Sequence, residues 1–127
     1  MTEKGCICRF FKKVWFDRFA VKESITDTTL KEIVNNIEEN KGVAALGGAV
    51  YKVRLARVGE GKSSGYRVLL FYRKGDRIFY VYAFSKSNRA NISQRELQIL
   101  KKEADILLQL DVSQLDTLVS IGELVEF

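Results

Sequence analysis

Three strand-like runs, rich in tyrosine and phenylalanine and interspersed with basic residues, lie close together in the chain and predict a fold that contains a sheet. They read AVYKVRLAR over residues 49–57, GYRVLLFYR over 65–73 and RIFYVYAFSK over 77–86. Side chains that alternate with a period of two predict β-strands. Lys74-Gly75-Asp76 separates the last two runs and predicts a tight hairpin. The middle of the chain is therefore expected to form an antiparallel sheet.

The positive charge of the chain is concentrated in this predicted sheet. Residues 50–92 contain ten Lys and Arg against two acidic residues, a net charge of +8, whereas the whole chain carries +5. In the first run, alternation places Lys52, Arg54 and Ala56 on one face of the strand. Regularly spaced cations on one face suit a phosphate backbone. They also occur as solvated residues on the open face of an antiparallel sheet, and the pattern alone leaves both interpretations open.

Two elements are expected at the start of the chain. Residues 6–11 are an apolar run that predicts a short strand, and Trp15, Phe16 and Phe19 recur at helical spacing. That spacing favours a core role for these three aromatic residues over an exposed docking stripe. Thr26 is the expected cap of the next helix, which ends before Gly42.

Two further helices are expected after the sheet. Residues 93–96 (SQRE) form a capping box for the first, and the second starts at Asp111 or Ser113 and ends at Gly122. The sequence thus predicts an α+β domain in the order β-α-α-β-β-β-α-α, with helices packed on one face of the sheet.

Length and composition narrow the classes of function. The 127 residues suit a single domain over 1–127. The chain has no histidine, which excludes Ser-His and Cys-His catalysis, and Cys6 and Cys8 alone cannot complete a zinc site. No apolar run reaches the roughly 20 residues that span a bilayer, and no signal peptide is evident. We expect a cytoplasmic protein without a cofactor, a bound metal or a membrane partner.

Three blocks in the predicted sheet resemble the RelE/ParE superfamily of bacterial toxin–antitoxin toxins. They are YKVRL at 51–55, SGYR at 64–67 and FSKSNR at 84–89. The element order extends the resemblance over about residues 6–110 and leaves 111–127 as a C-terminal extension. The loop 56–64 and the segment WFDRFAVKE at 15–23 resemble a HigB-like branch of the RelE-type toxins.

The resemblance implies a ribosome-dependent mRNA endonuclease that works in the ribosomal A site. It also implies a neighbouring antitoxin, often of the helix-turn-helix type. The matching positions assign candidate catalytic roles to Lys52, Arg54, Arg67 and Lys86. Cleavage without a metal needs a base for the 2′-hydroxyl, cations for the phosphorane and an acid for the leaving oxygen. Lys52 suits the base, Arg54 and Arg67 the phosphate contacts, and Lys86 the acid or a further cation. Candidate RNA-binding residues are Arg57, Lys62 and Arg89.

The chain departs from the RelE pattern at two positions. Ser87 stands where the family has an arginine, and Ser93 stands where it has a late tyrosine. Arg89 either replaces the missing arginine or simply faces solvent, and the sequence leaves both open. Ser93 is better explained as a helix cap, and Tyr82 as a buried sheet aromatic rather than a substitute phenol. Two alternatives therefore stay open beside the endonuclease. One is a ParE-like inhibitor of DNA gyrase, and the other is an RNA-binding module that cuts nothing.

Overall fold

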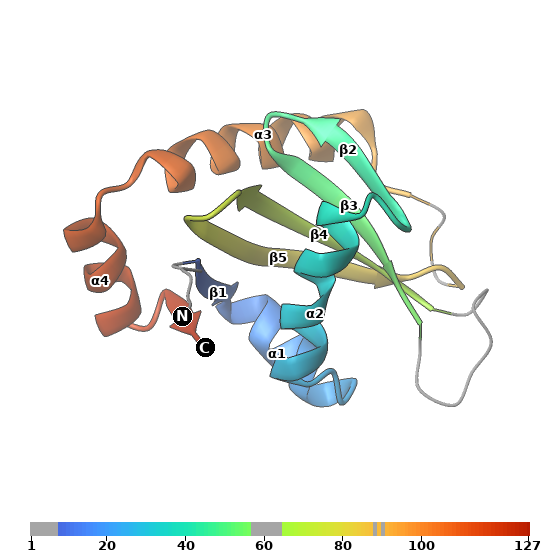
Figure 1. Ribbon diagram of the computed structural model, residues 1–127, viewed down its shortest axis with the longest axis horizontal. Helices are drawn as coiled ribbons and strands as arrows, with labels where there is room; N and C mark the ends of the chain where they lie inside the picture. Colours follow the sequence, from blue (N-terminus) through green and yellow to red (C-terminus); the bar gives the residue numbers. More distant parts are fainter. Residues whose placement is uncertain (1–7, 57–64, 88, 90) are drawn as a thin grey trace.

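The computed structural model describes residues 8–56, 65–87, 89 and 91–127, which form a six-stranded sheet and four helices (Figure 1). The sheet order is β2-β3-β4-β5-β1-β6, antiparallel except where β1 runs parallel to β5. In chain order the elements are β1 (Arg9–Lys13), α1 (Val14–Lys22), α2 (Asp27–Glu38), β2 (Val43–Gly47), β3 (Val50–Leu55), β4 (Tyr66–Arg73), β5 (Arg77–Ser85), α3 (Gln94–Gln109), α4 (Val112–Ser120) and β6 (Leu124–Glu126).

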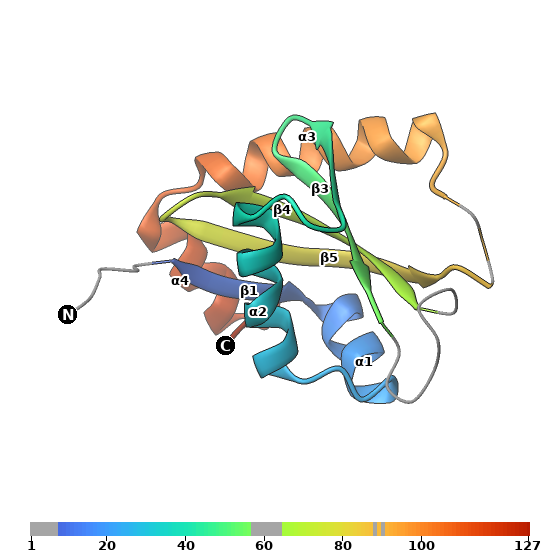
Figure 2. The ribbon, with the colours of Figure 1, turned by 45° about the vertical axis from the view of Figure 1, so that its right-hand side comes forward.

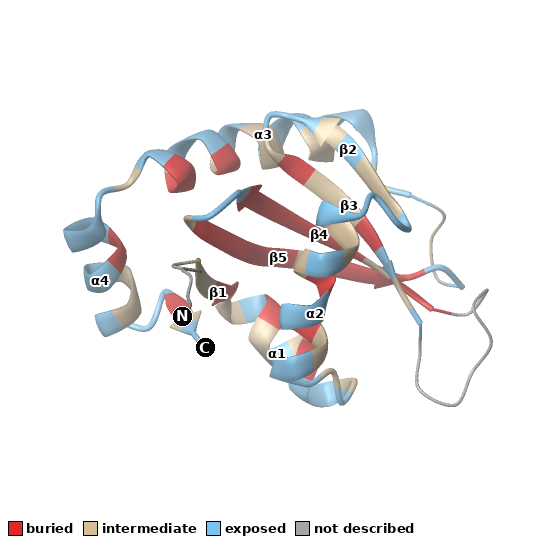
Figure 3. Cartoon of the chain, viewed as in Figure 1, coloured by how far each residue is buried: buried red, intermediate tan, exposed pale blue. Residues whose placement is uncertain are grey.

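The three predicted strand runs form β3, β4 and β5 at the centre of the sheet. β4 is buried on both faces, because Val68 and Leu70 belong to one core while Leu69 and Phe71 belong to another. Figure 3 shows the burial of β4 and β5 along most of their length. The predicted turn joins them, with Gly75 at φ 73° and the Asp76 N–H bonded to the Arg73 carbonyl at 3.1 Å.

Helices cover both faces of the sheet. Phe16 of α1 and Leu30 and Ile33 of α2 pack on one face, whereas α3 and α4 contribute Ala104 and Leu115 to the core on the other. Figures 1 and 2 show α2 crossing one face and α3 running along the opposite one. The α+β class is confirmed, but the expectation of helices on one face only is wrong. Consecutive apolar residues of β4 point to the two faces in turn, so both faces are apolar and both require a helical layer.

The helix starts follow their capping residues as predicted. The Thr26 side chain accepts a hydrogen bond from the Thr29 N–H at the start of α2. Ser93 and Glu96 form the capping box of α3, and Asp111 with Gln114 forms another at the start of α4. Each cap satisfies N–H groups that the first helical turn leaves without partners.

Two strands, β2 and β6, were not predicted from the sequence. β2 reads VAALG, which has no polar alternation, and it joins β3 through a turn at Gly47 and Gly48, both with positive φ. β6 has three residues and pairs with β1. β2 and β6 form strands because they pair with β3 and β1, and neither has a residue pattern that predicts a strand. The element order is therefore β-α-α-β-β-β-β-α-α-β.

The last 17 residues belong to the fold rather than forming an extension. Arg9 of β1 lies 2.8 Å from a carboxylate oxygen of Asp116 in α4 and 2.8 Å from one of Glu126 in β6. Phe127 packs against Phe10 and Tyr80, with ring centroids 5.8 and 5.7 Å away. The first strand predicted over 6–11 starts at Arg9, and Cys6 lies outside the described residues.

The aromatic residues of α1 separate into core and surface. Phe16 is fully buried, as expected, and Phe19 is partly buried. The expectation of a core role is wrong for Trp15, whose side chain is 47% exposed. Trp15 occupies the position next to Phe16 on the helix, about 100° around it, and therefore points along the sheet edge rather than under it.

Arg77→Met should destabilise the fold, because the Arg77 side chain is buried and holds the end of α3. Its guanidinium donates to the carbonyls of Leu110 at 2.6 Å and Leu107 at 3.3 Å, and its Nε to Asp76 at 2.9 Å. Loss of these charged hydrogen bonds should cost about 1.5–3 kcal/mol of unfolding free energy. Arg73→Met is the matched control, since Arg73 also pairs with Asp76 but is half exposed, and should cost below about 1 kcal/mol. Urea denaturation measures both, and equal losses would contradict this role.

Candidate functional site

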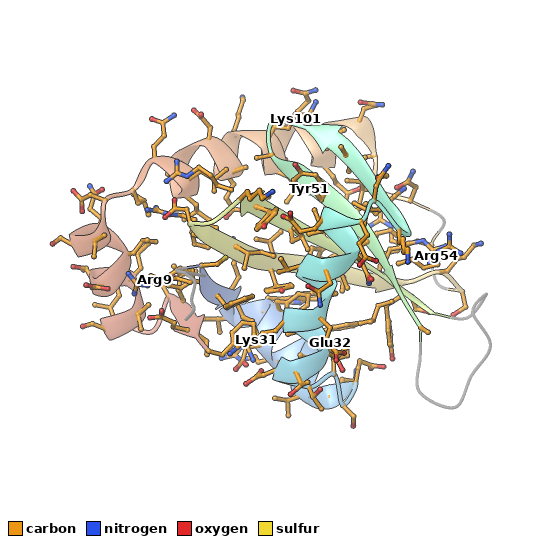
Figure 4. All side chains as sticks on the ribbon, in the orientation of Figure 1. Arg9, Lys31, Glu32, Tyr51, Arg54 and Lys101 are labelled. Atoms are coloured by element: carbon orange, nitrogen blue, oxygen red, sulfur yellow. The ribbon has the colours of Figure 1, made fainter. Side chains whose placement is uncertain are left out.

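Strands β3 and β4 place two arginines directly opposite each other. Arg54 pairs with Arg67 in the antiparallel register, and Lys52 pairs with Leu69 two residues along. Side chains directly opposite share a face, with Cβ atoms about 5 Å apart. Lys52, Arg54 and Arg67 therefore lie on the face that carries α3. Figure 4 shows Arg54 at the end of β3, on the opposite side of the molecule from Arg9.

A shallow pocket of about 250 Å³ collects these three cations. Lys52, Arg54 and Arg67 line it together with Gly42, Val43 and Ala44 at the start of β2. The Arg54 N–H donates to the Gly42 carbonyl at 3.0 Å, which fixes β2 beside the pocket. The unpredicted strand β2 thus forms one wall of the site that β3 and β4 supply with charge.

The two opposed arginines have no carboxylate partner within the described parts of the chain. Like charges directly opposite each other on a sheet destabilise it. Elsewhere the chain neutralises such charges: Arg9 and Lys12 each contact two carboxylates within 3.0 Å. An anion bound between Arg54 and Arg67 would relieve the repulsion, and a guanidinium pair matches the oxygens of a phosphate group.

Lys52 is anchored by a residue that the sequence did not identify. Its Nζ donates to Asn91 Oδ1 at 3.3 Å, and the same oxygen accepts the Ile92 N–H at 2.9 Å. Asn91 lies just before α3 and far from Lys52 in sequence. No motif marks it, so only the tertiary structure places it at the site.

Lys86 lies beside the start of β4. It follows β5 directly, its backbone N–H donates to the Gly65 carbonyl at 3.2 Å, and its side chain is exposed. Gly65 is needed there because a Cβ atom would collide with the Leu55 carbonyl of β3. Lys86 is therefore near Arg67 along the strands but does not line the pocket of Lys52, Arg54 and Arg67.

Arg89 is held against the protein rather than projecting freely. Its guanidinium pairs with Glu96 of α3 at 2.7 Å, donates to the Asn91 carbonyl at 3.0 Å and lies 5.5 Å from the Phe84 ring centroid. Two hydrogen bonds lower the pKa of Glu96 to about 2: the larger effect comes from the Arg89 side chain and the next from the Ser93 backbone N–H.

The remaining positions singled out from the sequence are Arg57, Lys62, Ser93 and Tyr82. The candidate RNA-binding residues Arg57 and Lys62 lie outside the described residues. Ser93 acts as a helix cap, as predicted. Tyr82 is only partly buried and packs against Trp15 and Phe84. No described group of three or more His, Cys, Asp or Glu side chains is arranged to hold a metal ion.

Comparison with known families identifies the chain. Residues 8–127 match the family of the RelE toxin of the RelE/RelB toxin–antitoxin system. The chain belongs to the RelE toxin family. The match continues to Phe127, whereas the sequence resemblance was expected to end near residue 110. The matched range includes α4 and β6, which pairs with β1. No curated protein matches the chain significantly.

As a RelE-family toxin, the protein is the toxin of a toxin–antitoxin system and has an antitoxin as its counterpart. None of its described helices combines the length and apolar character that crossing a membrane requires. The cation pocket, lined by Lys52, Arg54 and Arg67, is the candidate functional site of this toxin.

Glu96→Gln should change how the stability of the toxin depends on pH while keeping the cap of α3. Glutamine also serves in a capping box, but it removes the charge that pairs with Arg89. Because the pKa of Glu96 falls from 4.5 to about 2 on folding, its contribution is present above pH 4.5 and is lost as the pH falls towards 2. Thermal melts of both proteins across this range should show a Tm difference that closes with acidification. A constant difference would contradict the role of the charge.

Proposed function

We propose that this RelE-family toxin is an endoribonuclease that cuts mRNA in the ribosomal A site and thereby arrests translation in the cytoplasm. The observation that carries the proposal is Arg54 directly opposite Arg67, with no carboxylate between them in the described chain. This arrangement costs stability in the free protein and suits a bound phosphate. A toxin that inhibits gyrase by contact alone has no need of it.

Phosphate cleavage without a metal assigns a role to each cation. The 2′-oxygen of the RNA attacks the phosphorus, the bond to the 5′-oxygen breaks, and one proton leaves the 2′-hydroxyl while another reaches the 5′-oxygen. Arg54 and Arg67 stabilise the charge on the phosphorane oxygens. Lys52, held by Asn91, takes the proton of the 2′-hydroxyl, and Lys86 supplies charge or the proton for the leaving oxygen.

The proposed toxin has two partners, an antitoxin that inhibits it and the ribosome on which it acts. A neighbouring antitoxin, of the helix-turn-helix type that accompanies a HigB-like branch, keeps the toxin inactive. The net charge of +8 over residues 50–92 favours association with the ribosome, whose RNA is anionic, and makes that association faster at low salt.

Arg67→Ala should strongly slow cleavage while leaving the fold intact. Arg67 is partly exposed, and the side-chain contact it makes, to the Tyr66 carbonyl at 3.4 Å, is weak. Removal of one transition-state contact should lower the cleavage rate about a hundredfold to a thousandfold. Primer extension on mRNA bound to purified ribosomes measures the rate, and circular dichroism melts report the fold.

Arg73→Ala is the matched control for this experiment. Arg73 is an exposed arginine at the other end of β4, where it pairs with Asp76, and its removal should leave cleavage unchanged. Full cleavage by a stably folded Arg67→Ala protein would show that Arg67 does not stabilise the phosphate in the transition state. Intact mRNA with the wild-type toxin would instead favour gyrase inhibition or RNA binding without cleavage.

A further inference from the structure

The row that contains the two arginines continues onto an aromatic surface at the edge of β5. Arg54 lies opposite Arg67, and Arg67 lies opposite Phe84. In the neighbouring row, Lys52 lies opposite Leu69, which lies opposite Tyr82. Because directly opposed residues share a face, the aromatic side chains of β5 and the cations of β3 and β4 lie side by side.

The edge of β5 is accessible in this region because its partner strand is short. β1 pairs with β5 only from Arg77 to Tyr80, after which the chain turns into α1. Trp15 of α1 occupies the vacated edge, with its ring centroid 4.9 Å from Tyr82 and 5.3 Å from Phe19, on which it stacks. Tyr82 in turn lies 6.2 Å from Phe84. We call these four residues the aromatic ledge: Trp15, Phe19, Tyr82 and Phe84.

A pocket of about 250 Å³ opens on the ledge. The ledge residues line it together with Glu23, Tyr66, Ala83, Ser85 and Arg89. The Glu23 carboxylate accepts a hydrogen bond from the Tyr66 hydroxyl. The Arg89 guanidinium is fixed at its rim by Glu96 and by the Phe84 ring. Trp15 remains 47% exposed, although burial of an aromatic ring of that size ordinarily stabilises a fold. Phe84 is buried beneath the Arg89 guanidinium, and Phe19 and Tyr82 are partly buried. The exposed part of the ledge is therefore Trp15, supported by Phe19 and Tyr82, with a guanidinium nearby.

Single-stranded nucleic acid is the occupant that matches this combination. Proteins that bind single strands place phosphates on cations and stack the bases on aromatic side chains. Here the strand register leads from Arg54 through Arg67 to the buried ring of Phe84. Tyr82 lies beside Phe84 and contacts the exposed ring of Trp15. The adjoining cation pocket favours an occupant that carries an anion beside the group in contact with the ledge.

We propose that the aromatic ledge is a base-stacking subsite for a nucleotide next to the phosphate held by Arg54 and Arg67. The proposal rests on the RNA-cleaving function given above, and it adds the surface that receives a base. Stacking accepts any base because every base has an aromatic face. The ledge therefore contributes affinity and register rather than sequence preference.

The chain carries its own probe, because Trp15 is its single tryptophan. The purified full-length toxin is titrated with a short 2′-O-methyl oligouridylate, which lacks the 2′-hydroxyl needed for cleavage, and with a strand of equal length whose residues are all abasic. The base-bearing strand should change Trp15 fluorescence and bind roughly tenfold to a hundredfold more tightly. The abasic strand should bind through its phosphates and leave the fluorescence almost unchanged.

Variants separate the base contact from the phosphate contact, with binding followed by the anisotropy of labelled strands. Trp15→Leu keeps apolar bulk and should remove the preference for the base-bearing strand, whereas Trp15→Phe should retain most of it. Val21→Ala, at an exposed position of the same helix, should change nothing. Arg67→Ala should weaken both strands by the same factor. Thermal melts identify any variant that fails to fold.

Three results would overturn the ledge proposal. Equal binding of the two strands by the wild-type toxin would leave the phosphate site standing without a base subsite. Unchanged base preference in a folded Trp15→Leu protein would place the base elsewhere. A Trp15 fluorescence change with the purified antitoxin, and none with the base-bearing strand, would make the ledge a protein-docking surface. Cleavage on ribosomes, measured separately, decides whether the RNA-cleaving function survives each result.

Discussion

The pairing of β4 with both of its neighbours is the constraint on which the rest of this toxin depends. β4 is hydrogen-bonded to β3 on one side and to β5 on the other, and its apolar side chains enter both cores. A slip of one residue would move every side chain of β4 to the opposite face. The register that buries Val68 and Leu69 on opposite faces therefore also sets Arg67 between Arg54 and Phe84. Core packing and the geometry of the site are determined together.

Because helices cover both faces, a ligand can reach the sheet only at its ends and edges. The cation pocket lies where β2, β3 and β4 meet, and the aromatic ledge lies where β1 ends beside β5. Cations with structural roles are neutralised, as Arg9 is by Asp116 and Glu126. Arg54 and Arg67 have no such partner in the described chain, and a bound anion would relieve the repulsion between them.

The sequence predicted the parts of this fold that carry local signals. The three strand-like runs predicted β3, β4 and β5, and the capping residues Thr26 and Ser93 predicted the starts of α2 and α3. β2 and β6 were missed because neighbouring strands, rather than their own residues, define them. The shared face of Lys52 and Arg54 followed from alternation, but Asn91 and the exposure of Trp15 depend on contacts between distant segments, which no local pattern encodes.

A double-mutant cycle on Arg54 and Arg67 tests most directly whether the two guanidinium groups act on one phosphate. The rate of mRNA cleavage on purified ribosomes is measured for the wild-type toxin, Arg54→Ala, Arg67→Ala and the double variant. If both arginines hold the same phosphate, the double variant should lose far less than the product of the two single losses, a coupling of about 0.5–3 kcal/mol. Single losses that multiply fully in the double variant would show that the arginines act independently and would contradict the account.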